Sequence, residues 1–589
     1  MKSSRLNIVK IVNNNFHMIG AVCRADAGYF IFSLLVRMLS GIYTSFLYVY
    51  LLGIVLYCIE NENSVSYILL FLTLSMVFFI AAFALQAYYD HIFKPVHRER
   101  VVNRLQQGLF DKLHNSDMEN YDIAQMYTTV ALANDEIATR PLDAMDNLFR
   151  GVECLISIGT IIIGIIPANG FVFGICIVSF VVGIFITNVQ SKKVVQYDED
   201  MRIKDKKISL LRCLLYLPEY AKDNRLSRVH DIFLQDYNVT VKDKERIAAK
   251  SGKQIANLSF LQKMFCNAFC IDFLIPFYLS VVVLLFGKLS ISEFVIAINA
   301  GAQIQQKLES LTDIISDFLK NGRFAERIQN IDKIQCNIEA AVGGPVDSMQ
   351  TLSVKGATFF YPDGTLGLSD VNLTIHKGSK IAIVGSNGSG KSTLIKLLLR
   401  FYDAASGEIL QNGIDIRTYD ISSYRSQFSV AFQDFNIYAT SIRNNVCMGD
   451  DMDEDRLRDA LNKAGLSDSI KDLNAQLTRE FDENGILFSG GLLQRLALAR
   501  VFYKDSDIVI MDEPTAAMDV FFEKQFYDTI FKNLKEKTVI FISHRLSSIT
   551  ACDKIIFMDH GKILEEGTHE YLMNLQGGYY RLFCAQFES

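Results

Sequence analysis

Two short stretches in the second half of the chain combine the residue types that bind and hydrolyse a nucleoside triphosphate. The first, GSNGSGKST, has the spacing GxxxxGK[ST] and lies between the apolar runs KIAIV and LIKLLLRF, so it predicts a glycine loop between a strand and a helix. Such a loop surrounds phosphates with backbone N–H groups at a helix N-terminus. The predicted phosphate-binding residues are Gly385, Ser386, Asn387, Gly388, Ser389, Gly390, Lys391, Ser392 and Thr393.

The second stretch, DIVIMDEP, is an apolar strand that ends in two acids, Asp512 and Glu513. Paired acids at a strand end can be surface charge, but the phosphate loop favours a catalytic role. Lys391 reaches the outer phosphates, and the Ser392 hydroxyl and Asp512 are expected to bind Mg²⁺. Glu513 then remains to orient and deprotonate the attacking water.

These motifs lie in a part of the chain that alternates short β-rich runs with helical stretches. This pattern predicts an α/β domain over residues 351–589, preceded by a polar linker at 331–350. The composition of residues 1–330 is different. They hold six apolar runs of about the length that crosses a membrane, near residues 29–59, 67–89, 152–166, 171–189, 265–286 and 291–312.

The loops between these runs orient the protein. Basic residues follow the second, fourth and sixth runs, whereas the other loops, ENENS, PANG and GKLSISE, are short and nearly free of positive charge. The positive-inside rule therefore predicts a multi-pass protein of the cell membrane with both termini in the cytoplasm. The polar, basic N-terminus has no apolar core before Asp26 and does not resemble a cleaved secretion signal.

The two long cytoplasmic connections, residues 90–151 and 190–264, are charged at helical spacing. We expect helices to continue well beyond the membrane, since each helical residue adds about 1.5 Å. Each connection contains a break, near residues 121–126 and 218–225, that is a candidate docking elbow.

A few polar residues interrupt the predicted spans. Asp272, Asn299, Gln303 and Gln306 are candidates for a transport pathway, because polar groups at membrane depth usually face a bundle interior or a wet cavity. Asp272 can equally pair with a neighbouring polar side chain. In the last run, Asn299, Gln303, Gln306, Ser310, Asp313 and Asp317 recur at three- or four-residue spacing and form a polar stripe. Below Ser310 this stripe is expected to be the solvated face of a cytoplasmic helix.

Composition excludes other classes of function. With 59 basic and 65 acidic residues the formal net charge is −6, which gives no basic excess for nucleic acid. The 11 cysteines form no zinc-like CxxC pair, so we read them as small buried apolar residues.

Together these motifs resemble those of ATP-binding cassette (ABC) exporter half-transporters over nearly the whole chain. The resemblance implies the type IV architecture, a helical six-span membrane domain joined to an α/β P-loop NTPase domain. Four further residues occupy family positions, and each role is what the resemblance implies. Tyr361 in FFYPDG stacks on adenine, Gln433 in VAFQD senses Mg²⁺ and the γ-phosphate, His544 in FISHRL steadies the γ-phosphate and water, and Asp519 in TAAMD crosses the dimer interface.

In this family ATP lies between two nucleotide-binding domains, so the resemblance implies a second half-transporter. The two elbows become coupling helices that dock near Gln433, Phe435 and Tyr438, and ATP-driven closure alternates access to the substrate. The family signature LSGGQ faces the partner's ATP. Here the corresponding residues are Phe488, Ser489, Gly490, Gly491 and Leu492. Gln494, two residues after Leu492, again matches the family sequence.

Leu492 replaces the signature amide, a loss of about 1 kcal/mol for a neutral hydrogen bond. Because the catalytic residues of the chain itself are intact, either a homodimer that tolerates Leu492 or a heterodimer with a different partner is compatible with the sequence. Two exposed leucines would begin the signature helix in either assembly.

The predicted function is ATP-driven export of a peptide, a lipid or a hydrophobic small molecule. YDIAQMY, PEYAKDNRL and TREFDENG are most similar to bacterial exporters of peptides such as lantibiotics. Lipid or multidrug export is the runner-up to peptide export. An ATP-gated sensor or channel and an importer on the same fold are the further alternatives.

Overall fold

The structure is a computed structural model that describes residues 8–587 except 124–125, 127–129, 131–132, 135, 166–169, 218–219, 287–289, 332–335, 340–342, 514–519 and 544–545. The chain divides into two compact units. We call Met1–Asp111 with Thr129–Lys333 the helical unit, and Lys112–Thr128 with Ile334–Ser589 the α/β unit. A short segment of the first long connection, residues 90–151, therefore belongs to the α/β unit.

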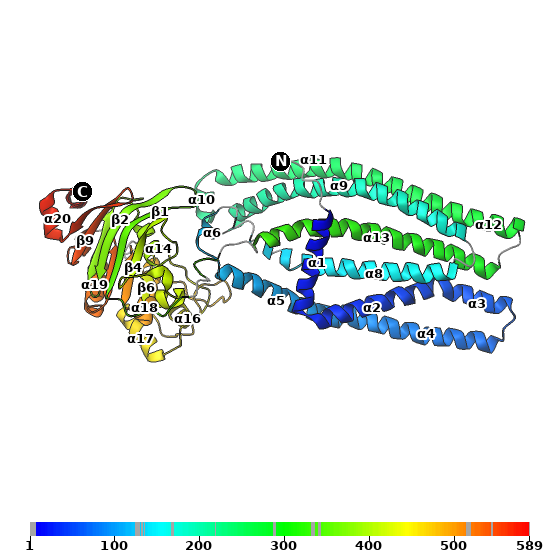
Figure 1. Ribbon diagram of the computed structural model, residues 1–589, viewed down its shortest axis with the longest axis horizontal. Helices are drawn as coiled ribbons and strands as arrows, with labels where there is room; N and C mark the ends of the chain where they lie inside the picture. Colours follow the sequence, from blue (N-terminus) through cyan, green and yellow to red (C-terminus); the bar gives the residue numbers. More distant parts are fainter. Residues whose placement is uncertain are drawn as a thin grey trace. The chain divides into compact units, whose positions relative to one another are not determined.

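The helical unit consists of long helices that run side by side, with α1 crossing them (Figure 1). Its elements are α1 (Ile8–Ala25), α2 (Ala27–Ser45), η1 (Phe46–Tyr50), α3 (Leu51–Glu60), α4 (Val65–Tyr88), η2 (Tyr89–Phe93), α5 (Lys94–His114), α8 (Arg140–Ile165), α9 (Gly170–Tyr216), α10 (Ala221–Leu226), α11 (Val229–Gln262), η4 (Lys263–Leu274), α12 (Ile275–Phe286) and α13 (Ile291–Ile331). The last few residues of α5 lie in the α/β unit.

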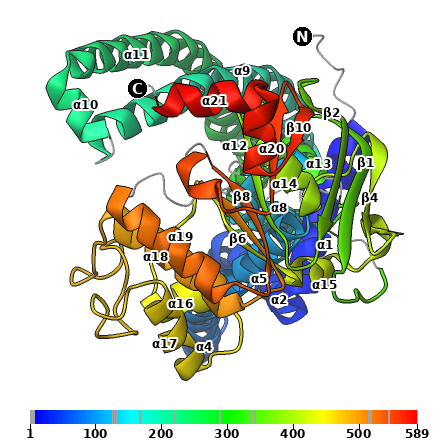
Figure 2. The same ribbon diagram turned by 90° about the vertical axis from the view of Figure 1, so that its left-hand side faces the viewer.

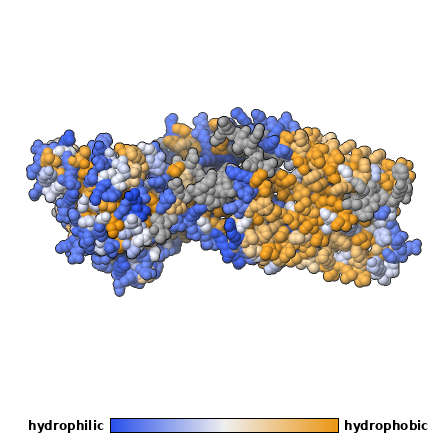
Figure 3. All heavy atoms as spheres, in the orientation of Figure 1, coloured by the Kyte–Doolittle hydropathy of each residue, from blue (hydrophilic) through white to orange (hydrophobic). Residues whose placement is uncertain are grey.

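Four helical stretches in the described part of the chain are long and apolar enough to cross a membrane: Ala27–Glu60, Val65–His114, Phe171–Tyr216 and Val229–Leu285. The third and sixth predicted spans fall on α8 and α13, which are not among these four stretches. The count of six spans therefore remains a prediction. Met76 and Val77 of α4 are 64% and 66% exposed, as expected for side chains that contact lipid. Figure 3 shows a continuous hydrophobic surface over one end of the helical unit.

Small and polar residues bring the helices of this unit close together. A Cβ atom at Gly41 of α2 would lie 2.8 Å from the Glu153 carbonyl of α8, so only glycine permits this approach. Near the other end of the same contact the Tyr50 hydroxyl donates to the Thr160 carbonyl at 2.7 Å. Asn14 of α1 donates to the Gly322 carbonyl of α13 at 3.0 Å. These hydrogen bonds satisfy polar groups that the apolar surroundings would otherwise isolate.

The α/β unit contains two sheets, visible from the side in Figure 2. The first has the order β2-β1-β4-β5 and its pairs are antiparallel; it comprises β1 (Thr351–Phe360), β2 (Leu366–His376), β4 (Ser406–Gln411) and β5 (Ile414–Asp415). The second has the order β10-β9-β3-β8-β7-β6, parallel except for the β10–β9 pair; it comprises β3 (Lys380–Gly385), β6 (Phe428–Ala431), β7 (Ile508–Asp512), β8 (Thr538–Ile542), β9 (Lys554–Asp559) and β10 (Lys562–Gly567).

The central parallel strands are buried along their whole length, which explains their uninterrupted apolar sequences. Alternation along β3 sends Ile381 and Ile383 into one hydrophobic core and Ala382 and Val384 into another. The helices of this unit are α6 (Glu119–Asp122), α14 (Lys391–Leu398), η5 (Ile416–Thr418), α15 (Ile421–Ser426), α16 (Ile442–Cys447), α17 (Glu454–Lys463), α18 (Gly490–Lys504), α19 (Val520–Asn533), η6 (Leu546–Ile549), α20 (His569–Leu575) and α21 (Gly578–Phe587).

Candidate functional site

The predicted phosphate loop joins the end of β3 to the start of α14, as its sequence indicates. Gly388 and Gly390 have φ values of +76° and +101°, which glycine adopts readily and other residues do not. The Lys391 ammonium donates to the carbonyls of Gly385 and Ser386 at 3.0 and 2.9 Å. Burial lowers the pKa of Lys391. The loop therefore holds its lysine directly over the backbone that is expected to surround the phosphates.

Asp512 lies at the end of β7, beside the phosphate loop. The Ser392 hydroxyl donates to Asp512 Oδ2 at 3.4 Å, whereas Oδ1 is buried without a hydrogen-bond partner in the described part of the chain. Burial, and secondly the charge of Glu513, raise the pKa of Asp512 to about 6. A buried carboxylate oxygen without a donor is costly unless a cation binds it, so Asp512 and Ser392 fit a Mg²⁺ site.

Glu513 follows β7 in a strained conformation, with φ at +49°. Its N–H donates to the Ile542 carbonyl of β8 at 3.0 Å, so the neighbouring strand fixes this turn. Its carboxylate accepts a hydrogen bond of 3.0 Å from the Gln433 side chain. The structure thus brings Gln433 to the acidic pair Asp512–Glu513, about 80 residues later in the sequence.

Tyr361 lies just after β1 and close to the phosphate loop. Its hydroxyl shares a hydrogen bond of 2.9 Å with the Thr393 hydroxyl. Its ring packs edge-on against Phe359 at 5.0 Å between centroids, and the Lys396 ammonium lies 5.6 Å from its centroid. The half-buried Tyr361 ring is therefore fixed at a position suited to stacking on a base.

The signature residues surround the N-terminus of α18. Ser489 is the N-cap residue and its side chain makes no capping hydrogen bond, while Gly490 and Gly491 have open space where a Cβ atom would be. Ser489 and Gly490 are exposed, which leaves the first N–H groups of a 15-residue helix accessible to an anion.

The two leucines at this helix start are not exposed, contrary to the expectation from sequence: Leu492 and Leu493 are both half-buried. Leu492 packs with Phe488 against the hydrophobic core of the α/β unit. Position 492 thus contributes to folding of its own domain. The adjacent Gln494 has its side-chain oxygen buried without a partner among the described residues.

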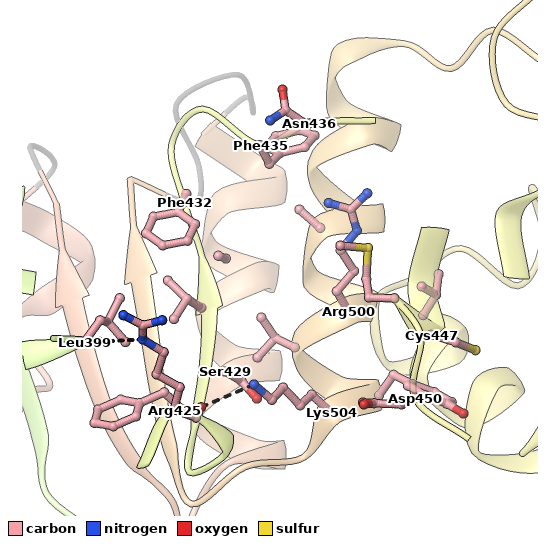
Figure 4. A pocket seen from close by; sticks show the side chains of 18 of the residues that line it. Leu399, Arg425, Ser429, Phe432, Phe435, Asn436, Cys447, Asp450, Arg500 and Lys504 are labelled. Carbon is pink, nitrogen blue, oxygen red and sulfur yellow. Dashed lines mark hydrogen bonds between the residues drawn. The ribbon is translucent and has the colours of Figure 1, made fainter. Parts of the chain in front are cut away.

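Beside Gln433 a groove of about 480 Å³ lies between β6, α16 and α18. Figure 4 shows Phe432 and Phe435 at one end and Arg500 and Lys504 along the α18 side. Arg500 is held by a 2.7 Å hydrogen bond from Nε to the Asn445 carbonyl. The groove is lined mainly by apolar side chains and by the basic side chains of Arg425, Arg500 and Lys504. In the sequence, Gln433 lies between its lining residues Phe432 and Asp434.

Comparison with known proteins agrees with this arrangement. Residues 368–516 match the ABC transporter family. A solved bacterial Atm1-family ABC exporter with ATP bound superimposes with a TM-score of 0.77, over 96% of this chain and 98% of that chain, at 22% sequence identity. This chain has the fold of an ABC exporter half-transporter. Its ABC transporter domain implies ATP binding, and its apolar helices indicate a membrane protein.

The chain spans about half the length of the curated relatives that it matches. An ATP-dependent lipid A-core flippase from Idiomarina loihiensis is 33% identical over 51% of this chain and 52% of its own. The subtilin transport ATP-binding protein SpaT from Bacillus subtilis is 34% identical over 49% and 48%. The mitochondrial iron-sulfur clusters transporter ATM1 from Candida glabrata is 37% identical over 48% and 38%.

For several residues predicted from the sequence, the assigned role stays a prediction. Asp519 and His544 lie outside the described residues. Asp272 is exposed on η4, Asn299 and Gln303 are half-buried on α13, and Gln306 is exposed on the same helix. Their assignment to a transport pathway stays a prediction.

The structure also reveals features that the sequence reasoning missed. The polar stripe below Ser310 is predicted to be a solvated helix face, and Asp313 in it is exposed. Asp313 and Asp317 also line a cavity of about 440 Å³ in the helical unit, together with residues of α8, α9, α11 and η4. Farther along α8, Glu153 pairs with Arg37 at 3.5 Å and with Lys307 at 3.2 Å. The helical spacing of the stripe was the only sequence signal for the cavity.

Proposed function

We propose that the chain is one half of an ATP-driven exporter and that Glu513 is the general base for ATP hydrolysis. The observation that carries this proposal is the position of Glu513. Its strained backbone places the carboxylate just beyond the buried Asp512, and Gln433 donates to it at 3.0 Å. A carboxylate oriented beside a phosphate loop is suited to accept a proton from water.

In this mechanism the N–H groups of the phosphate loop and Lys391 bind the phosphates, and Tyr361 stacks on adenine. Glu513 accepts a proton from the attacking water as the water oxygen bonds to the γ-phosphorus and the bond to the bridging oxygen breaks. Ser392, Asp512 and Gln433 are the residues that would hold Mg²⁺, which when bound offsets the charge of the β- and γ-phosphates. His544 would steady the γ-phosphate and the attacking water.

A single chain does not complete this site. The exposed N-terminus of α18, with Ser489, Gly490 and Gly491, would face the γ-phosphate held by a second half-transporter, and Asp519 would cross the interface between the two. Similarity to half-transporters supports this pairing. The second chain is either a further copy or a different half-transporter.

Transport would follow from closure of the two ABC domains. The groove beside Gln433 fits an elbow of the membrane domain, and the segment near residues 218–225 is the proposed occupant. The ABC domains would lie in the cytoplasm and the helices in the cell membrane, as the loop charges favour. The names of the relatives, which include a lipid A-core flippase and a subtilin transport protein, support a peptide, a lipid or a hydrophobic small molecule as cargo.

The test is ATP hydrolysis by the full chain in lipid nanodiscs. We expect steady phosphate release that requires Mg²⁺, falls at least 100-fold in Glu513→Gln and falls similarly in Lys391→Ala, while Glu513→Gln still binds ATP. Inverted membrane vesicles should accumulate the cargo only with ATP. ATP-gated passive flux that persists in Glu513→Gln would contradict export.

A further inference from the structure

The first elbow, which belongs to the α/β unit, is held to the rest of that unit by hydrogen bonds at two points. The buried carboxylate of Asp117 accepts three backbone hydrogen bonds, from the N–H groups of Asn337 at 2.7 Å, Ile338 at 2.9 Å and Glu339 at 3.1 Å. Five residues further on, at the end of α6, Asp122 accepts a hydrogen bond of 2.6 Å from the Tyr402 hydroxyl. The elbow therefore contacts both the segment that leads into β1 and a side chain within the domain.

Tyr402 is only 1% exposed and belongs to the hydrophobic core around β1 and β2. Its ring lies 5.1 Å from that of Phe359 and 5.9 Å from that of Tyr361, edge-on to the latter at 75°. The Lys396 ammonium lies within 6 Å of both tyrosine centroids, at 5.6 Å from Tyr361 and 5.8 Å from Tyr402. Any shift of the Tyr402 ring must therefore disturb the packing that supports Tyr361.

The hydrogen bond to Asp122 is the polar anchor of this ring. Burial, and secondly the hydrogen bond to Asp122, raise the pKa of Tyr402, so the phenol stays protonated and donates at any physiological pH. A bond from a buried phenol to a carboxylate is among the stronger hydrogen bonds in proteins. Elbow and ring are thus joined by one short bond between residues 280 positions apart.

We propose that Asp122 and Tyr402 are positioning residues through which the first elbow controls how Tyr361 meets the base of the nucleotide. This inference rests on the proposed stacking of adenine on Tyr361. The bond holds Tyr402 against Tyr361, so base binding is stronger when the elbow is in place. By linkage, base binding in turn stabilises the elbow in this position.

The experiment uses a property of the sequence, which contains no tryptophan. Tyr361→Trp in a Glu513→Gln background gives a single tryptophan at the proposed stacking position, and ATP titration of the full chain in nanodiscs should quench its fluorescence. We expect Asp122→Ala and Tyr402→Phe each to raise the apparent Kd for ATP about five-fold, within the usual range of coupling between sites. Because both remove the same bond, the double variant should be no weaker than the single ones.

Two controls separate this link from a general structural defect. Tyr121→Phe removes another tyrosine hydrogen bond of the same elbow, to the Leu113 carbonyl, and should leave the Kd unchanged. Inorganic tripolyphosphate has no base, so its affinity, measured by competition with ATP, should be equal in all variants. The KM for ATP measured with Tyr361 and Glu513 intact should show the same five-fold rise, with kcat changed less.

The link would be overturned by an unchanged Kd in Asp122→Ala, by additive effects in the double variant, or by an equal loss of tripolyphosphate affinity. A different result would count against the proposed function instead. If radiolabelled ATP binds and Lys391→Ala abolishes that binding, but the tryptophan does not respond and Tyr361→Ala has no effect on ATP affinity, then adenine does not stack at this position.

Discussion

Gln433 Nε2 donates a hydrogen bond of 3.0 Å to Glu513 Oε2. Gln433 is also flanked in sequence by Phe432 and Asp434, which line the groove. One side chain thus connects the proposed catalytic carboxylate to the surface proposed to receive the membrane domain. Movement of Phe432 or Asp434 at the groove can therefore reach Glu513 through the neighbouring Gln433.

We predict that Gln433→Ala lowers kcat for ATP hydrolysis about ten-fold, because Glu513 loses the donor that orients it. The KM for ATP should change less, since Lys391 and Tyr361 remain. Steady-state phosphate release measures both parameters. Asn436→Ala, at another residue of the groove lining, is the matched control and should retain near-normal kcat. Equal losses in the two variants would indicate a general effect of the groove.

The sequence predicted the parts of the site that are local motifs. The phosphate loop and the acids at the end of β7 depend on a strand, a glycine loop and a helix that are adjacent in the chain, and their spacing identifies them. The apolar runs likewise predicted long helices. In each case the physical cause lies within about 20 residues.

Long-range contacts were not predictable in this way. The bond between Asp122 and Tyr402 joins positions 280 residues apart, and neither residue has a sequence context that identifies a partner. The sequence predicts that Leu492 is exposed, because the family signature faces the ATP of a second domain. In the structure Leu492 is half-buried. Its packing with Phe488 depends on how the domain core surrounds α18, which a single sequence does not specify.

Leu492 gives a second prediction, in which activity and stability change in opposite directions. Leu492→Gln restores the amide of the family signature and should raise kcat about three-fold, in line with one neutral hydrogen bond in the composite site. It also removes apolar packing against the core, so stability should fall by about 1 kcal/mol. ATPase assays and thermal unfolding of the same preparation measure the two effects.

The neighbouring residue provides the control for this test. Leu493→Gln places the same amide one position later, about 100° around the helix, and should not raise kcat. A Leu492→Gln variant with unchanged turnover would show that the amide is dispensable in this chain. A rise that appears only when a different half-transporter is added would identify the assembly as a heterodimer.

Asp117 gives a third prediction, on the stability of the elbow. Asp117→Ala leaves the N–H groups of residues 337–339 without their acceptor, at a cost of about 3 kcal/mol. Hydrogen exchange of peptides covering these residues should accelerate, because the amides lose protection. Asp117→Asn keeps one acceptor oxygen and should show a smaller effect. Asp111→Ala, an exposed acid on the preceding helix, should leave exchange at 337–339 unchanged.

Asp512 gives a prediction on pH. Burial raises its pKa to about 6 in the folded protein, above its ordinary value near 3.8, so the fold disfavours the ionised form when no cation is bound. When folding raises the pKa of a group, that group's contribution to the free energy of unfolding is fully present below its ordinary pKa. The contribution is lost as the pH rises through the pKa of the folded state. The nucleotide-free protein should therefore lose stability between about pH 4 and pH 7 at this residue.

Asp512→Asn cannot ionise and should not lose this contribution. In EDTA and without nucleotide, we expect the variant to unfold at a higher temperature than the unsubstituted protein at pH 7.5, by a stabilisation on the order of 2 kcal/mol. The difference should shrink at pH 5, where Asp512 is mostly protonated. Asp468→Asn, at an exposed acid of the same unit, should show no such trend.

With Mg²⁺ and ATP present the order of the two unfolding temperatures should reverse, because only the carboxylate binds the cation well and ligand binding stabilises the folded state. A difference that does not depend on pH would show that the charge of Asp512 is already offset in the free protein.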